Sequence, residues 1–92
     1  MMQEVLHNPT QNRYELHVDG GIVFADYVQN GDMLLITHTE TPPILQGKGL
    51  ASRLVKGMLS HIRSRGQKVR PLCSFVAEYI ERHPEEQDLL LD

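Results

Sequence analysis

The chain has a single cysteine, few aromatic residues and no tryptophan, and these absences narrow the class of protein. One cysteine cannot form an internal disulfide, so we expect a protein of a reducing compartment. The five histidines lie far apart, without the short spacings of a metal site, so we expect no bound metal. No apolar run approaches the roughly 18 residues that a membrane-spanning helix needs, and the start does not resemble a signal peptide. We therefore expect a cytoplasmic protein with no membrane partner.

Positive charges are fewer than negative ones, so the 92 residues carry a formal net charge of −3. That balance argues against a nucleic-acid partner, which normally requires a basic surface. Residues 48 to 70 nevertheless hold seven lysines and arginines and no acidic residue. Such a local field suits a small polyanion, although a solvated helix face is the simpler reading of a charge run. The length and the ordinary hydrophobic content predict one globular domain, residues 1–92.

The first forty residues have the pattern of four strands joined by tight turns. Residues 13 to 18 alternate between apolar and polar, as in a half-buried strand. Asp19-Gly20 and Asn30-Gly31 are hairpin signals, because glycine accepts the positive φ that such turns require. We therefore expect an antiparallel meander with strands at 3–7, 13–18, 22–28 and 33–39.

The hydrophobic period then changes to 3.6 residues, which predicts a helix over 48–65 that ends at Gly66. Gly57 interrupts this helix at a cost of about 1 kcal/mol, which close packing on the sheet would explain. Residues 68–72 predict a fifth strand parallel to the fourth. Ser74 is the expected N-cap of a short second helix, 75–82, and the acidic tail either docks through Leu89 and Leu90 or frays.

The predicted fold class is therefore α+β: a four-stranded antiparallel meander, a crossover helix, a fifth strand parallel to the fourth, and a second short helix. The segment Gln46-Gly47-Lys48-Gly49-Leu50-Ala51 falls between the fourth strand and the long helix. Its glycines let the backbone approach a ligand closely, and the helix adds unpaired N–H groups and a positive dipole end. Together these predict an anion site for phosphate or pyrophosphate.

In this context the segment resembles the pyrophosphate-binding motif of the GNAT acetyltransferase superfamily, which reads Gln or Arg, two residues, Gly, one residue, Gly or Ala. Gln46, Gly49 and Ala51 occupy its fixed positions. The chain is also similar to a very short subfamily in which a His-Thr-Glu segment ends the fourth strand and a Pro-x-Cys segment ends the fifth. Here these are His38-Thr39-Glu40 and Pro71-Leu72-Cys73, so the likeness covers nearly the whole chain.

The resemblance implies an N-acetyltransferase with acetyl-coenzyme A as co-substrate, no metal, and an amine acceptor that the sequence does not identify. Main-chain N–H groups of residues 46 to 51 would hold the pyrophosphate, and the pantetheine arm would lie between strands four and five. Lys48 and Arg53 would favour the ribose phosphate. The cofactor-binding residues so implied are Ile44, Leu45, Gln46, Gly47, Lys48, Gly49, Leu50, Ala51 and Arg53.

Four side chains are candidates for the chemistry: Cys73, His38, Glu40 and Tyr79. In direct transfer, Glu40 or His38 would act as the base and Tyr79 would protonate the departing sulfur. In covalent transfer, Cys73 would take the acetyl group first, with a thiol pKa lowered by the start of the second helix and His38 as its base.

Each of these residues also has a purely structural interpretation. Cys73 could be a small buried hydrophobe, His38 could end a strand, Glu40 could be a solvated loop residue, and Tyr79 could belong to the core.

The predicted protein is also short for an acetyltransferase. Because residues 8 to 12 alone connect the first two strands, the acceptor site must be open, completed by a partner subunit, or absent. Two alternatives to an enzyme therefore stand: a coenzyme A or acyl-coenzyme A sensor without turnover, and a protein-interaction module that retains the fold. The edge strand at 3–7 allows either a monomer or a weak homodimer.

Overall fold

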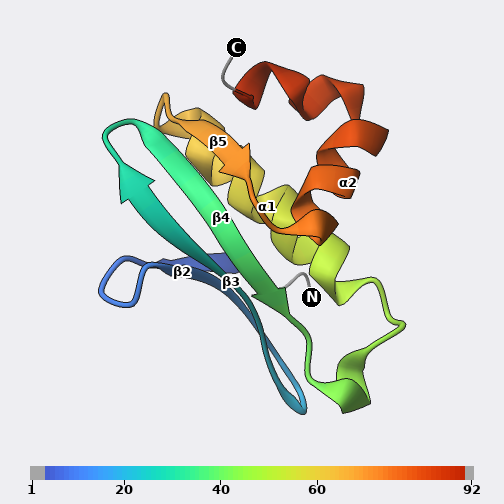
Figure 1. The fold of residues 1–92 in the computed structure, drawn as a ribbon. Coiled ribbons are helices and arrows are strands. Elements are labelled where there is room, and N and C mark those ends of the chain that lie inside the picture. Colours follow the sequence, from blue (N-terminus) through green and yellow to red (C-terminus); the bar gives the residue numbers. More distant parts are fainter. Residues whose placement is uncertain (1–3, 91–92) are drawn as a thin grey trace.

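The protein, described here over residues 4–90 by a computed structural model, is one five-stranded sheet with two main helices (Figure 1). The strands lie side by side in sequence order. The first four are antiparallel neighbours and the fifth is parallel to the fourth, which confirms the predicted fold class. The strands are β1 (Val5–Asn8), β2 (Arg13–Val18), β3 (Gly21–Asn30), β4 (Met33–Glu40) and β5 (Lys68–Pro71).

The strands follow the alternation of the sequence, and the turns follow the glycines. Tyr14 and Leu16 of β2 are fully buried, whereas their neighbours along the strand are more exposed, as the pattern predicts. The hairpin signalled by Asn30-Gly31 is present: Asn30 pairs with Met33, and Gly31-Asp32 form the loop between them. Gly31 has a φ of +63°, the positive value for which a glycine is suited in such a turn. The first predicted strand began at Gln3, which lies outside the described residues.

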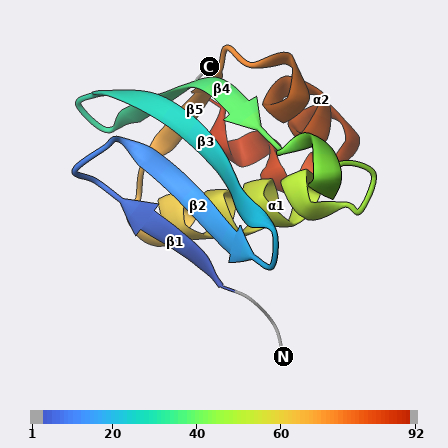
Figure 2. The ribbon, with the colours of Figure 1, turned by 90° about the horizontal axis from the view of Figure 1, so that it is seen from below.

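Helix α1 (Leu50–Ser64) crosses one face of the sheet and buries its apolar stripe there (Figure 2). It begins two residues later than predicted, because Gly49 adopts a left-handed φ of +73° and serves as the N-cap. Gly57 lies directly against Val5 of β1. A Cβ added to Gly57 would overlap Cγ2 of Val5 and lie 2.8 Å from its Cβ, which confirms that this glycine permits close packing. The buried residues of α1 are Leu50, Leu54, Val55, Met58, Leu59 and Ile62.

Helix α2 (Ser74–Arg82) follows β5, and the short 3-10 helix η2 (Pro84–Leu89) follows α2. The expected N-cap was wrong: Cys73 occupies that position, Ser74 is the first helical residue, and no side chain caps the helix. The acidic tail docks as far as it is described, because Leu89 is buried and Leu90 pairs with Val69. Residues 91 and 92 lie outside the described residues.

An irregularity in β4 decides which of its last side chains face the helices. Asp26 pairs with His38, but the next residue of β3, Tyr27, pairs with Ile36, so Thr37 is an extra residue on β4. Such a bulge reverses the alternation beyond it. Thr39 pairs with the buried Ala25 and therefore faces the helices, the side that Ile36 also faces. Without the bulge, His38 would have taken that side.

A group of aromatic and cationic side chains joins β1, β2 and β3 to the second half of α1. The ring of His7 stacks on Tyr14 at a centroid distance of 4.5 Å. Its Nε2 lies 2.6 Å from the hydroxyl of Tyr27, and its Nδ1 lies 3.5 Å from the guanidinium of Arg65. The hydroxyl of Tyr14 lies 2.8 Å from Nδ1 of His61. We call these five residues the ring cluster.

Candidate functional site

A cleft of about 540 Å³ opens where β4 and β5 separate. The parallel pairing ends at Ile36 and Pro71, and the amides of Leu72 and Cys73 both donate to the carbonyl of Ile36. The last residues of β4 therefore have no partner on β5, and this unpaired end of β4 forms the inner wall of the cleft. The loop after β4, the first turn of α1 and the start of α2 complete the cleft. Its lining residues are His38, Thr39, Thr41, Leu45, Gln46, Gly47, Gly49, Leu50, Ala51, Ser52, Cys73, Ser74 and Phe75.

The loop before α1 contributes two glycines to the lining of this cleft. Gly47 and Gly49 have φ angles of +80° and +73°, and a Cβ added to either would meet no atom within 4 Å. The space above both glycines is therefore open. Within residues 4–90, no hydrogen bond uses the amides of residues 47 to 52 as donors. Consecutive N–H groups without an internal partner at a helix N-terminus have the geometry that suits an anion.

Gln46 departs from the expectation that its amide is one of these donors. Its main-chain N–H donates to the carbonyl of Pro43 at 3.3 Å, and its side-chain amide donates to the carbonyl of Thr41 at 3.2 Å. Gln46 thus holds the loop in shape, and the available donors begin at Gly47. Three of the other implied residues, Ile44, Lys48 and Arg53, are exposed and do not border the cleft, and Ile44 keeps 75% of its surface exposed.

Cys73 lies at the inner end of the cleft. Its Sγ lies 3.3 Å from the hydroxyl oxygen of Thr39. Burial raises the pKa of the thiol, but the Thr39 hydroxyl and the amides of Phe75 and Val76 outweigh burial, so the net pKa lies below its ordinary value. The amides belong to the first turn of α2, so the expected influence of that helix on the thiol is present in the structure.

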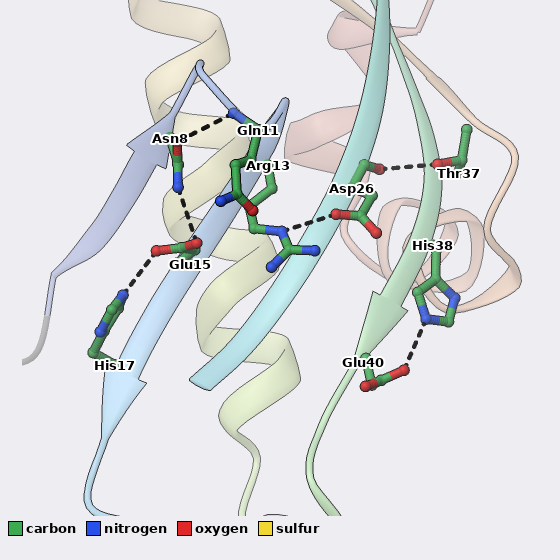
Figure 3. A network of polar contacts seen from close by, with 9 residues as sticks. All are labelled: Asn8, Gln11, Arg13, Glu15, His17, Asp26, Thr37, His38 and Glu40. Atoms are coloured by element: carbon green, nitrogen blue, oxygen red, sulfur yellow. Dashed lines mark hydrogen bonds and ion pairs between the residues drawn. The ribbon is translucent and has the colours of Figure 1, made fainter. Parts of the chain in front are cut away.

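His38 does not face Cys73, contrary to the expected pairing of base and thiol. Although His38 borders the cleft, its imidazole lies on the opposite face of the sheet, where Nε2 contacts Oε1 of Glu40 at 3.1 Å (Figure 3). The reason is the bulge at Thr37, which turns Thr39 toward the thiol and His38 away from it. Sequence reasoning did not select Thr39, and its identity alone carries no signal of this role. A bulge would have had to be located first.

Tyr79 lies outside the cleft, in a smaller neighbouring hollow of about 100 Å³. Its ring stacks on His83 at a centroid distance of 3.9 Å. Burial raises the pKa of its phenol, and the carboxylates of Glu86 and Glu85 raise it further. The structure therefore brings Cys73 and the glycine loop together, and places the candidate acid Tyr79 apart from them. We call the space that contains Tyr79 the second hollow. It is lined by Ser52, Phe75, Glu78, Tyr79, Arg82 and His83.

Two further kinds of site were sought within residues 4–90. No group of three or more histidine, cysteine, aspartate or glutamate side chains is placed to hold a metal ion. No helix in the same residues combines the length and the apolar character needed to cross a bilayer.

The fold and the cleft define a small α+β protein with a glycine-containing loop of main-chain donors, unpaired within the described residues, at the start of its crossover helix. Residues 13–89 match the family of GCN5-related N-acetyltransferases. Since that match spans most of the chain, this protein belongs to the GCN5-related N-acetyltransferase family.

Two curated relatives and one solved structure show how far the similarity extends. The chain is 24% identical over 86 residues to Protein NATD1 of Gallus gallus, which covers 88% of this chain and 76% of the relative. It is also 24% identical over 85 residues to Protein NATD1 of Homo sapiens, covering 87% and 74%. The solution structure of a GCN5-like protein from Staphylococcus aureus superposes with a TM-score of 0.74 at 24% identity, covering 97% of this chain and 88% of that one.

Proposed function

We propose that this protein binds acetyl-coenzyme A in the cleft between β4 and β5 and transfers the acetyl group to an amine. The observation that carries the proposal is the row of amides at residues 47 to 52, which donate no hydrogen bond within the described chain; these residues, Lys48 excepted, line a cleft that ends at Cys73. Membership of the acetyltransferase family supports the same reading.

The residues present fit the diphosphate of this co-substrate. An anion bound at the loop would accept several N–H groups and meet the positive end of the α1 dipole. The first turn of α1 contains no acidic residue that would repel it. The open space above Gly47 and Gly49 admits the phosphate oxygens, which a side chain at either position would obstruct. Acetyl-coenzyme A supplies an activated acetyl thioester when it is bound.

The placement of Cys73 favours the covalent route over direct transfer. Its thiolate would attack the thioester carbonyl and form an acetyl–sulfur bond, while the coenzyme sulfur leaves as a thiolate and takes up a proton. The acceptor amine would then attack the acetylated Cys73, which restores the thiol. In the direct route, the candidate bases His38 and Glu40 lie on the outer face of the sheet, and Tyr79 lies in the second hollow.

A binding experiment tests the first half of the proposal. Isothermal titration with acetyl-coenzyme A should give a saturable heat, and amide resonances of residues 47 to 52 should shift. The control ligand is S-acetylpantetheine, which lacks the diphosphate and should leave these amides unshifted. Absence of both heat and shifts with acetyl-coenzyme A would reject binding and leave the interaction module as the remaining reading.

Mass spectrometry of the intact protein tests the second half. Incubation with acetyl-coenzyme A should add one acetyl group, and the adduct should disappear in Cys73→Ala. Release of coenzyme A in an amine-dependent manner that survives Cys73→Ala would instead establish direct transfer.

A sensor without turnover is the second candidate, and one observation favours it. Residues 9 to 12 alone join β1 to β2, so no helical segment after the first strand is available to form an acceptor pocket. A sensor would bind acetyl-coenzyme A in the titration but would show neither an acetyl adduct nor amine-dependent release of coenzyme A.

A further inference from the structure

We infer that His7 is a proton-sensitive contact that holds strand β1 on the sheet and releases it when the imidazole is protonated. The inference goes beyond acetyl transfer, because none of the five residues of the ring cluster lines the cleft or the second hollow. β1 is the outermost strand, and within residues 4–90 it pairs with β2 alone (Figure 2). The opposite edge of the sheet differs, since Leu90 pairs there with Val69 of β5.

His7 is the polar side chain that connects β1 to elements beyond its neighbour β2. Its Nε2 lies 2.6 Å from the hydroxyl of Tyr27 on β3, so this contact reaches across β2. Its Nδ1 lies 3.5 Å from Nη1 of Arg65, the residue that caps the end of α1. The contact of Val5 with α1 is apolar, so it does not depend on pH, and Asn8 donates to a side chain of the adjacent β2.

The partners of His7 decide which of its nitrogens carries the proton. Arginine has no acceptor atom, so Nδ1 of His7 must accept from the guanidinium of Arg65. The single proton of a neutral imidazole then lies on Nε2, which donates to the hydroxyl oxygen of Tyr27. A second proton would place an N–H on Nδ1 opposite the N–H of Arg65, so that two donors and two positive charges would face each other. The contact therefore requires a neutral His7.

The titratable groups around His7 come from each element that packs against it. Helix α1 contributes Arg65 and His61, whose ring centroid lies 5.1 Å from that of His7. Strands β2 and β3 contribute the phenols of Tyr14 and Tyr27, which are uncharged at neutral pH because burial raises the pKa of both. The stacked ring of Tyr14 would attract an imidazolium, but burial, His61 and Arg65 together keep the pKa of His7 below its ordinary value of 6.5.

Protonation therefore favours the state in which β1 has left the sheet. With β1 in place the imidazole must stay neutral, whereas in a released β1 the side chain of His7 binds a proton at its ordinary pKa. As the pH falls below 6.5, the fraction of molecules with β1 released rises. β2 then becomes the edge strand and presents unpaired N–H and C=O groups to solvent.

Amide hydrogen exchange of the full chain, followed by NMR, tests the inference. The protected amides of residues 5 to 8 should exchange faster than those of β4, because an edge strand can open without global unfolding. After correction for the intrinsic pH dependence of exchange, their protection should fall by up to about tenfold between about pH 7.5 and pH 5.5. Low concentrations of urea should change this exchange less than that of β4, because the release of one strand exposes little surface.

Two variants assign the effect to His7. His7→Phe keeps an aromatic ring but cannot be protonated, so the protection of β1 should no longer depend on pH over this range. Arg65→Gln replaces the guanidinium with an uncharged amide that can accept from a protonated imidazole, so the fall in protection should be smaller. His17→Phe is the matched control, because His17 lies on β2 but contacts Glu15 outside the ring cluster, and the full fall should persist in this variant.

Several outcomes would overturn the inference. A fall that persists in His7→Phe, or that disappears only in His61→Phe, would assign the proton to another group. Equal protection of β1 and β4 at all urea concentrations would show that β1 does not open on its own, and protection of β1 that is independent of pH in the unaltered protein would exclude the role of the proton. If His7→Phe does not fold, an undiminished fall in Arg65→Gln has the same meaning. None of these measurements involves acetyl-coenzyme A, so the proposed function is tested separately.

Discussion

At the scale of single residues, Gly49 combines a structural requirement with an expected ligand requirement. Its φ of +73° would cost an alanine about 1 kcal/mol of folding stability. The same Cβ would stand in the open space above the loop, so Gly49→Ala should also abolish the heat of acetyl-coenzyme A binding. Urea denaturation and isothermal titration measure the two effects separately.

Gly31 is the matched control for this substitution. It has a φ of +63° and open space around its Cα, but it lies in the hairpin loop between β3 and β4 and does not border the cleft. Gly31→Ala should therefore lose similar stability and keep its affinity. Equal affinities in the two variants would mean that the loop before α1 does not contact the ligand.

Thr39 should control the reactivity of Cys73. Its hydroxyl lowers the pKa of the thiol, and Thr39→Val removes that hydroxyl while keeping the shape of the side chain. The pKa of Cys73 should rise, and alkylation by iodoacetamide at neutral pH should slow several-fold. The pH dependence of the alkylation rate measures this change.

His38→Gln serves as the comparison for Thr39→Val, since its side chain lies on the other face of the sheet and should leave the rate unchanged. The reverse result, with a slower rate in His38→Gln and no change in Thr39→Val, would show that the imidazole reaches the thiol in solution.

At the scale of elements, the contact between Gly57 and Val5 sets how closely α1 approaches β1. Gly57→Ala improves helix propensity by about 1 kcal/mol, but the added methyl overlaps a β-branched side chain that has little room to move. We expect net destabilisation of about 1–3 kcal/mol, the range of overpacked cores. Chemical denaturation of Gly57→Ala measures the change.

The double variant Gly57→Ala with Val5→Ala tests the cause. Removing the methyl groups of Val5 should recover part of the lost stability, so that the two substitutions are less harmful together than their sum. Additive effects would show that the overlap is not the reason for the loss.

The elements also show where prediction from the sequence succeeds and where it cannot. The stripe formed by Leu50, Leu54 and Met58 and the alternation of residues 13 to 18 placed α1 and β2 correctly, because burial imposes a period on apolar residues. The end of β4 is polar, so no hydrophobic pattern reveals the extra residue at Thr37. Simple alternation from Ile36 would place His38 toward the helices, whereas its imidazole contacts Glu40 on the other face of the sheet.

The cleft was predictable in part for the same reason. Glycines before a helix indicate open donors from local chemistry alone, so the loop at residues 47 to 51 could be located from the sequence. The amide of Gln46 is already used by the 3-10 turn at Pro43–Leu45, and the second hollow exists because of how α2 packs beside α1. Both are tertiary arrangements that a sequence pattern does not carry.

At the scale of the whole molecule, the ring cluster should make stability depend on pH at both ends of the range. Burial raises the pKa of Tyr14 to about 12 from 10.0, helped by the nearby Tyr27. The unfolded chain therefore loses the phenol proton first, and stability falls as pH rises from 10.0 toward about 12. By about pH 11 the loss due to Tyr14 should be roughly 1 kcal/mol, measured as a change in the stability difference between the unaltered protein and Tyr14→Phe.

At acid pH the stability falls as the pH drops, and the group responsible is His7. Burial lowers its pKa below 6.5, and the nearby His61 and Arg65 lower it further. The unfolded chain then binds the proton first, so stability should fall as pH drops below 6.5. Urea midpoints between about pH 7.5 and pH 5.5 should fall less in His7→Phe than in the unaltered protein. Equal slopes in the two proteins would assign the acid limb to other groups.

The position of Tyr79 has one more consequence. Since the chain has no tryptophan, its intrinsic ultraviolet fluorescence comes from three phenol rings, two of them in the ring cluster and the third in the second hollow. An aromatic ligand bound in that hollow would quench the emission of Tyr79 and leave the emission of the other two rings unchanged. Occupancy could then be followed in real time, without any dye attached to the protein.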